Sequence, residues 1–138
     1  MLEPLRHVLS AKRIVLCSGS PRRKELLRQI GLNFEIIPSN FEENLDKSSF
    51  SHPCHYVKEN AKQKALDVWR RLSVDKDSQP DLIIGADTVV SMDDKIYGKP
   101  QDEEDAIDML TALSGKKHTV FTGNRRINRP NVYMLRTL

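Results

Sequence analysis

The segment from Ser18 to Arg23 combines residue types that suit a phosphate group, reading Ser-Gly-Ser-Pro-Arg-Arg. An apolar run precedes it and a helical pattern follows, so backbone N–H groups and the positive end of a helix dipole would face one spot. Gly19 allows a ligand close to the backbone, and the guanidiniums of Arg22 and Arg23 can hold phosphate oxygens in forked geometry. The segment is neither a Walker loop nor a GxGxxG fingerprint. A capped helix with two solvated arginines fits the same residues, so the segment alone leaves phosphate binding open.

A second candidate is Asp87, in Gly85-Ala86-Asp87-Thr88. It follows the apolar run 82–86, which reads as a strand covered on both faces. A carboxylate after such a strand would lie at the carboxyl edge of the sheet, where open α/β folds place ligands. Mg²⁺ takes oxygen ligands, and Asp87 could supply one. For Asp87 taken alone, a simple turn-capping role is the favoured alternative.

Other charged residues are weaker candidates. Lys99 lies between Gly98 and Pro100, Glu42 and Glu43 lie in a polar stretch, and Lys64 lies in a helical pattern. Taken singly, they read as a surface turn, solubilising acids and a solvated lysine.

The elements that would position these groups alternate between strands and helices. Pro21 follows Ser20, a favourable N-cap, and Gly31 closes that helix. Apolar residues at helical spacing predict a longer helix from about Pro53 to Leu72. Strands are expected at 13–17, 33–38, 82–86 and 118–122, helices at 21–30, 53–72 and about 102–114, and a hairpin turn at 92–95. The alternation predicts an α/β fold.

Composition sets the broad class. The chain has 138 residues, 38% hydrophobic and 30% charged, which suits one globular domain. No apolar run approaches the roughly 20 residues of a membrane span, and the N-terminus lacks the apolar stretch of a signal peptide. Cys17 and Cys54 form no CxxC pair, so a reduced cytoplasmic protein without a membrane partner is expected. The net charge of +3 is smaller than the contribution of the four arginines in 124–138, so the remaining chain has no field that recruits nucleic acid.

The order of the motifs resembles the Maf family of nucleoside triphosphate pyrophosphatases over residues 12–123. The matching segments are 18–27, 61–65, 85–90, 98–100, 113–115 and 118–123. Inosine triphosphate pyrophosphatases share the architecture of the Maf family, but the residues at 20–23 and 86–88 favour membership of the Maf family. The amino-acid sequences of 41–47 and 59–66 are similar to those of the family branch in which a Maf domain precedes a methyltransferase-like portion. The resemblance implies a Maf/inosine triphosphate pyrophosphatase-like mixed sheet flanked by helices.

The resemblance also implies an activity, the hydrolysis of dTTP or UTP to the monophosphate and pyrophosphate with Mg²⁺ or Mn²⁺ as cofactor. Asp87 and one of Glu42 or Glu43, with Glu43 preferred, match the metal-associated acids. Asp87, Glu43 and Lys99 would be the catalytic residues. The phosphate-binding positions fall on Ser18, Arg22, Arg23, Lys64 and Lys99. Because family members are commonly dimers, the resemblance allows a homodimer.

The last residues depart from the family pattern. Family members continue beyond Thr122-Gly123 with further strands, whereas 124–138 reads as a divergent basic tail. We therefore expect a domain that is incomplete at its C-terminus, with exposed sheet edges and impaired activity. The alternative is a catalytically inactive isoform that binds a nucleotide or a partner.

Overall fold

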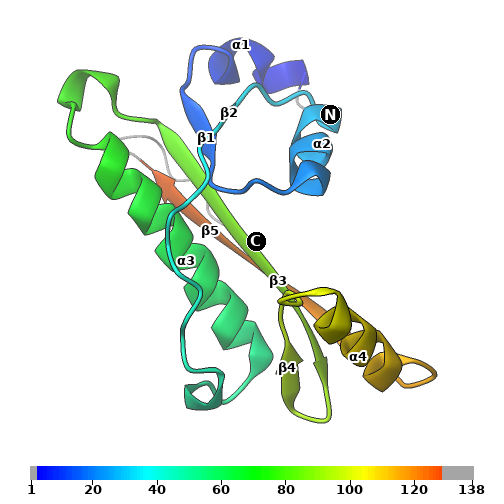
Figure 1. Ribbon diagram of the computed structural model, residues 1–138. Helices are drawn as coiled ribbons and strands as arrows, with labels where there is room; N and C mark the ends of the chain where they lie inside the picture. The colour runs from blue at the N-terminus through cyan, green and yellow to red at the C-terminus, as the bar shows by residue number, and fades with distance from the viewer. Residues whose placement is uncertain (1–2, 129–138) are drawn as a thin grey trace.

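The computed structural model describes residues 3–128, in which a five-stranded sheet is flanked by helices (Figure 1). Its α/β class and its mixed sheet confirm the predicted fold class. The strands are β1 (Ile14–Leu16), β2 (Glu35–Ile36), β3 (Leu82–Met92), β4 (Lys95–Tyr97) and β5 (Thr119–Asn128). The helices are α1 (Arg6–Leu9), α2 (Pro21–Gln29), α3 (Pro53–Leu72) and α4 (Glu103–Leu113).

The long strand β3 organises the sheet. One of its edges pairs with antiparallel β5 along almost its whole length, from Leu82↔Asn128 to Ser91↔Thr119. The other edge pairs first with parallel β1, up to Leu16↔Ile84, and then with antiparallel β4, from Val90↔Tyr97 onward. Between these two ladders, residues 85–89 have neither β1 nor β4 beside them. The sheet is therefore open on one edge of β3 at its middle.

The expected end of this strand at residue 86 was wrong, because β3 continues to Met92. Asp87 thus lies inside a strand, not beyond its end. The continuous ladder with β5 and the tight turn at Asp93 and Asp94, whose φ angles are 50° and 61°, keep the backbone extended through this region. Positive φ at both central residues is typical of the hairpin turns that match strand twist, so the predicted hairpin is confirmed.

Helix α3 has the predicted bounds and packs against one face of β3 and β5 (Figure 1). Its apolar residues contribute to two clusters. One contains Ala65 and Val68 with residues of β1 and β3, and the other contains Tyr56 and Val57 with Val89. The middle of α3 lies between these clusters along the helix. This arrangement holds a polar segment of the helix between two apolar anchors.

Two glycines bring α3 close to the sheet on either side of Asp87. A Cβ at Gly85 would overlap the carbonyl oxygen of Ala61 and lie 3.0 Å from the Cβ of Ala65. A Cβ at Gly123, the residue paired with Asp87 in β5, would lie 2.8 Å from the backbone nitrogen of Lys58. Only glycine permits this distance between helix and sheet at both positions.

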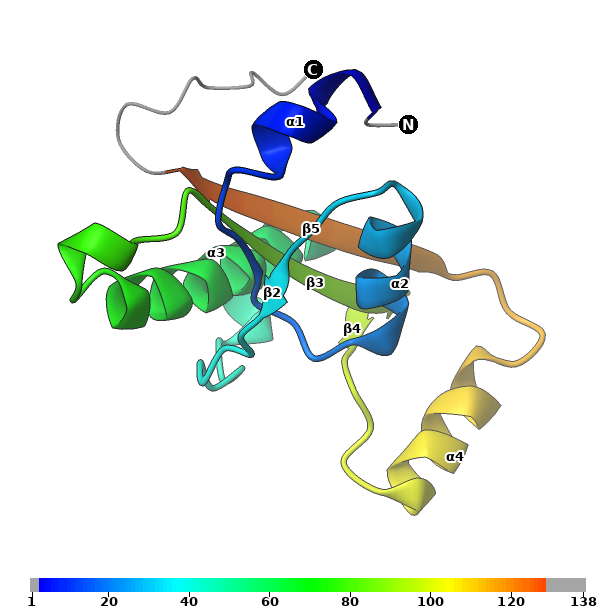
Figure 2. The ribbon, with the colours of Figure 1, turned by 90° about the horizontal axis from the view of Figure 1, so that it is seen from above.

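The other helices pack less closely. Helix α2 lies on the opposite side of β3 from α3 and has no buried residue (Figures 1 and 2). Helix α4 projects from the end of the sheet, and its Ile107 and Leu110 are 57% and 69% exposed. Strand β5 runs through residue 123 without a break, while residues 129–138 of the predicted basic tail lie outside the described residues. Within residues 3–128, no helix has the length and apolar character of a membrane span.

Candidate functional site

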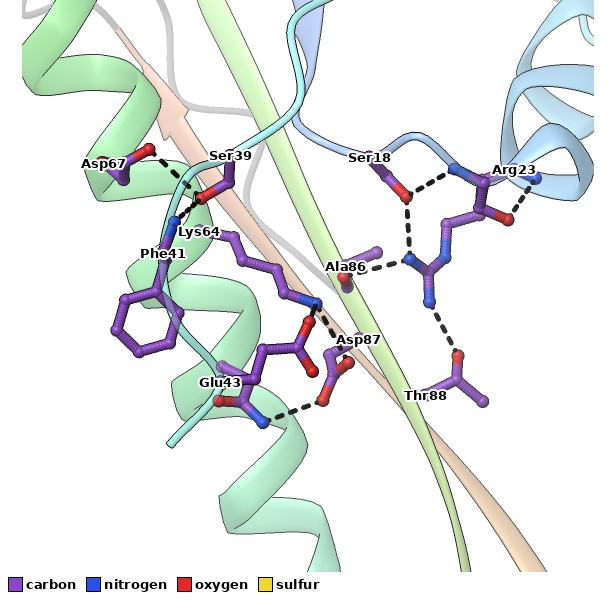
Figure 3. A network of polar contacts seen from close by, with 12 residues as sticks. Ser18, Arg23, Ser39, Phe41, Glu43, Lys64, Asp67, Ala86, Asp87 and Thr88 are labelled. Atoms are coloured by element: carbon purple, nitrogen blue, oxygen red, sulfur yellow. Dashed lines mark hydrogen bonds and ion pairs between the residues drawn. The ribbon is translucent and has the colours of Figure 1, made fainter. Parts of the chain in front are cut away.

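A hollow of about 440 Å³ lies beside the open edge of β3. Because successive side chains of a strand point to opposite faces, Asp87 and Thr88 reach it from different sides of the sheet. Figure 3 shows Ser18 and Arg23 on one side of β3, and Glu43, Lys64 and Asp87 on the other. The polar residues that line the hollow include Ser18, Ser20, Arg23, Ser39, Glu43, Lys64, Asp87, Thr88 and Lys99.

On the α2 side, a network of hydrogen bonds fixes Arg23. Its Nη1 donates to Ser18 Oγ at 3.0 Å and to the carbonyl oxygen of Ala86 at 3.2 Å, and its Nη2 donates to Thr88 Oγ1 at 3.0 Å. The bond to Ala86 falls where β3 has no strand partner on this edge, so the guanidinium satisfies a backbone carbonyl that a strand would otherwise bond. Ser20 caps α2, since its Oγ accepts from the Arg23 backbone nitrogen at 3.5 Å.

On the α3 side, a lysine lies between two carboxylates. Lys64 Nζ lies 2.6 Å from Glu43 Oε1 and 3.2 Å from Asp87 Oδ1. Lys64 and Asp87 are only 7% and 4% exposed. A buried charge is costly unless it is paired, and here each charge has a partner of opposite sign. The second oxygen of Asp87 accepts a hydrogen bond from Asn60 Nδ2 at 3.1 Å.

The loop that carries Glu43 is tethered to α3 through Asp67. Its Oδ2 accepts hydrogen bonds from the Asn40 backbone nitrogen at 2.9 Å, from Ser39 Oγ at 3.2 Å and from Arg71 Nη2 at 3.2 Å. Burial acts to raise the pKa of Asp67, but the hydrogen bond from Asn40, the charge of Arg71 and the remaining hydrogen bonds outweigh it and lower that pKa below the usual value. The loop position therefore depends on the carboxylate of Asp67.

The structure gathers most of the predicted site residues but not all of them. Ser18, Arg23, Glu43, Lys64, Asp87 and Lys99 line one hollow. Arg22 does not line it: its side chain is 74% exposed and lies 3.9 Å from Glu25. Glu42 is exposed and also lies outside the lining. The roles assigned to these residues remain predictions.

Sequence reasoning missed two residues of this site, Asn60 and Thr88. Asn60 offered a signal, because it lies four residues before Lys64 and thus on the same helix face, next to the apolar stripe of Val57 and Ala61. Two polar residues on a face that packs against a sheet point to a buried polar contact. Thr88 offered none, because its hydrogen bond with Arg23 depends on the placement of α2 beside β3.

The donor set fits a hard divalent cation whose coordination is completed by the substrate. Glu43 and Asp87 already direct carboxylate oxygens at one positive group, the ammonium of Lys64. In residues 3–128 no group of three or more His, Cys, Asp or Glu side chains could hold a metal ion. Mg²⁺ is commonly held by one or two carboxylates together with waters and substrate phosphates. Two carboxylates beside a hollow of about 440 Å³ meet that requirement.

Comparison with known proteins places this sequence in a family. Residues 13–135 match the family of Maf-like proteins, so the match continues past residue 123. The chain is 51% identical over 123 residues to a "Probable bifunctional dTTP/UTP pyrophosphatase/methyltransferase protein" of Homo sapiens, covering 89% of this chain and 20% of that protein. It is 52% identical over 112 residues to the "dTTP/UTP pyrophosphatase" of Ruminiclostridium cellulolyticum, covering 81% of this chain and 54% of that one.

A third relative is the "Nucleoside triphosphate pyrophosphatase" of Dictyostelium discoideum, 48% identical over 114 residues, or 83% of this chain and 52% of that protein. The chain thus spans about half the length of the two shorter relatives. The family match, residues 13–135, covers the whole of β1 to β5, the strands around which the hollow is built. On this evidence the chain belongs to the Maf family.

Proposed function

We propose that this chain binds a nucleoside triphosphate in the hollow beside β3 and hydrolyses it to the monophosphate and pyrophosphate. One observation carries the proposal: cationic groups and carboxylates from opposite faces of β3 converge on one hollow of about 440 Å³. The printed names of relatives about 50% identical support dTTP and UTP as the substrates. Phosphoryl-transfer sites work mainly by positioning and by charge stabilisation, which such an arrangement supplies.

The phosphate chain would lie against the N-terminus of α2. There the backbone N–H groups and the hydroxyls of Ser18 and Ser20 offer hydrogen bonds, and Arg23 offers a fixed guanidinium. Lys99 is exposed at the rim of the same hollow and would add a flexible positive charge. These groups would neutralise the charge that develops on the leaving pyrophosphate.

The carboxylates would act on the attacking water. The water oxygen bonds to the α-phosphorus, the bond from that phosphorus to the oxygen bridging to the β-phosphorus breaks, and pyrophosphate leaves. Both oxygens of Asp87 accept hydrogen bonds, from Lys64 and Asn60, whereas Glu43 contacts Lys64 through Oε1 alone in the described residues. We therefore assign acceptance of the water proton to Glu43 Oε2 and orientation of the water to Asp87.

Glu43 and Asp87 would also hold a divalent ion, Mg²⁺ or Mn²⁺. Such an ion, when bound, neutralises phosphate oxygens and polarises the α-phosphoryl group. Two free cysteines, Cys17 and Cys54, suit a reducing compartment such as the cytoplasm. A homodimer stays a prediction, which sedimentation of the purified chain would test.

Matched pairs of variants test the site assignment through pyrophosphate release from dTTP and UTP. We expect Asp87→Asn and Arg23→Ala to lower kcat/KM by about 100-fold or more. Glu43→Gln should lose activity, whereas its exposed neighbour Glu42→Gln should retain it. Arg22→Ala, beside Arg23, should likewise retain most of it. Equal losses in the two members of either pair would contradict the assignment.

The chain itself is to be measured beside a full-length relative. Pyrophosphate release that depends on Asp87 supports the proposal at any measurable rate. If dTTP raises the melting temperature of the chain but no pyrophosphate is released, the chain is a nucleotide-binding protein and the proposed hydrolysis is wrong.

A further inference from the structure

Asn60 is a buried polar residue that its own packing does not explain. Its side chain is 0% exposed, in the middle of α3 between the two apolar clusters. Its Oδ1 is buried and makes no hydrogen bond with any described residue. Leaving a buried carbonyl oxygen without a partner costs stability, and an apolar residue of similar shape would avoid that cost. The side chain therefore has a use other than the stability of α3.

The hydrogen bond of the side-chain nitrogen, Nδ2, indicates that use. Asn60 Nδ2 donates to Asp87 Oδ2 at 3.1 Å, while Lys64 Nζ donates to Asp87 Oδ1 at 3.2 Å. Because the two donors are four residues apart, they project from the same face of α3. Two donors on two oxygens fix the plane of the carboxylate, which a single donor would leave free to rotate.

The two donors differ in what else they contact. Lys64 is shared with Glu43, at 2.6 Å, and it lines the hollow where phosphates would bind. Its ammonium can exchange a carboxylate for a phosphate oxygen without leaving the site. Asn60 does not line the hollow, and among the described residues its amide donates a side-chain hydrogen bond to Asp87 alone. It is the donor that can hold Asp87 in place while Lys64 changes partners.

The sheet is built to permit this contact. Gly85 precedes Asp87 by two residues on the same face of β3, and Gly123 faces Asp87 across the β3–β5 ladder. Both glycines let the backbone of α3 come closer than a Cβ would allow. Asn has a short side chain, so its amide reaches Asp87 only because the helix is this close.

We propose that Asn60 is a positioning residue for the reaction, fixing the carboxylate of Asp87 toward the substrate. The proposal rests on the pyrophosphatase function proposed above. Residues that orient a ligating or catalytic carboxylate commonly affect activity by roughly 10- to 100-fold when they are replaced. The contact is made with Asp87 and not with the nucleotide, so its loss should act on kcat and leave KM nearly unchanged.

Two variants separate positioning from packing. Asn60→Leu fills a similar volume and removes the unpartnered oxygen, but it also removes the donor to the buried Oδ2 of Asp87, so its urea midpoint should lie above that of Asn60→Ala. Asn60→Ala leaves a cavity, so its midpoint should fall. Both lack the donor to Asp87. We expect kcat for pyrophosphate release from dTTP to fall about 10- to 100-fold in both, with KM within about twofold.

The outcomes are distinct. Equal losses of kcat in two variants that differ in stability support positioning. If either folded variant keeps kcat within about twofold of the unaltered chain, Asn60 is not a positioning residue. Asn60→Leu in an Asp87→Asn background should cause little further loss, and a full additional loss would contradict action through Asp87. If the unaltered chain releases no pyrophosphate, the proposed function fails first and this inference fails with it.

Discussion

Helices α3 and α4 start from similar sequence patterns and end in different environments. Each has a side-chain cap, His52 Nδ1 bonding the Cys54 nitrogen at 3.1 Å and Asp102 Oδ1 bonding the Asp105 nitrogen at 2.8 Å. Each carries an apolar stripe. Yet seven residues of α3 are buried and none of α4 is. The candidate site is built on α3, whereas Ile107 and Leu110 of α4 face solvent.

The difference lies in the surface that each helix meets. Helix α3 lies over strands whose glycines, Gly85 and Gly123, leave room for its backbone. Helix α4 extends beyond the end of the sheet and has no such surface beneath it within residues 3–128 (Figure 2). An amphipathic pattern is thus sufficient for a helix, but only a matching strand surface gives it a buried face on which a polar site can be built.

The largest expected effect comes from closing the space beneath α3. Gly85→Ala would overlap the Ala61 carbonyl, and backbone cannot rotate away as a side chain can. We expect a loss of about 3 kcal/mol in the free energy of unfolding, measured by urea titration. Gly19→Ala is the matched control, because a Cβ there meets nothing within 4 Å, and its stability should change by less than about 0.5 kcal/mol. A loss of less than about 1 kcal/mol for Gly85→Ala would contradict the explanation that the glycines of the sheet give α3 its buried face.

A truncation in each helix measures the comparison directly. Val68 of α3 is 0% exposed and Leu110 of α4 is 69% exposed. Val68→Ala should cost about 2 kcal/mol, whereas Leu110→Ala, although it removes more carbon, should cost less than about 0.5 kcal/mol. Urea midpoints with equal slopes would provide the two values. A cost for Leu110→Ala as large as that for Val68→Ala would show that α4 is buried against something in solution.

The tether of the Glu43 loop to α3 should depend on pH. Because the folded-state pKa of Asp67 is lowered, its contribution to stability is present above the usual Asp pKa and is lost as pH falls through the folded value. Asp67→Asn should therefore cost about 1 kcal/mol at pH 7, and the difference should shrink below about pH 4. Asp94→Asn, in the exposed turn after β3, is a control with little expected difference at either pH. A pH-independent cost for Asp67→Asn would contradict the role of its charge.

The smallest expected effect concerns the reactivity of the Cys17 thiol, which is buried in the apolar cluster with Ala65 and Val68 of α3. Burial raises the pKa of its thiol to about 12, so almost no thiolate is present at pH 8. Alkylation followed by mass spectrometry should modify the half-buried Cys54 well before Cys17. In Gly85→Ala, if α3 separates from the sheet, Cys17 should become reactive. Equal rates for both cysteines in the unaltered chain would mean that the region opens readily.

Most helices and strands could be predicted from local signals in the sequence, namely capping residues and the spacing of apolar residues. Helix α3 has its predicted bounds because Pro53 opens it and the apolar residues repeat at 3.6. The end of β3 was misplaced because Asp87 and Thr88 resemble residues that end a strand, while pairing with β5 keeps them extended. Asp87 pairs with Gly123 and Thr88 with Thr122, and pairing between residues so far apart in the chain leaves no local signal, so tertiary contacts decide such cases.

The candidate site divides in the same way. The residue types at Ser18, Arg23 and Asp87 made them candidates for a phosphate and carboxylate site, and the resemblance of the motif order to the Maf family turned the candidates into a prediction. Residue order could not separate Arg23 from Arg22, because adjacent positions on a helix point in different directions and only the placement of α2 beside β3 selects one. Asn60 was missed for a related reason. Its partner lies 27 residues away and is reached only because two glycines let a helix come close to the sheet. The sequence by itself determined which chemical groups are available, and the distances between elements decided which of them lie together in one hollow.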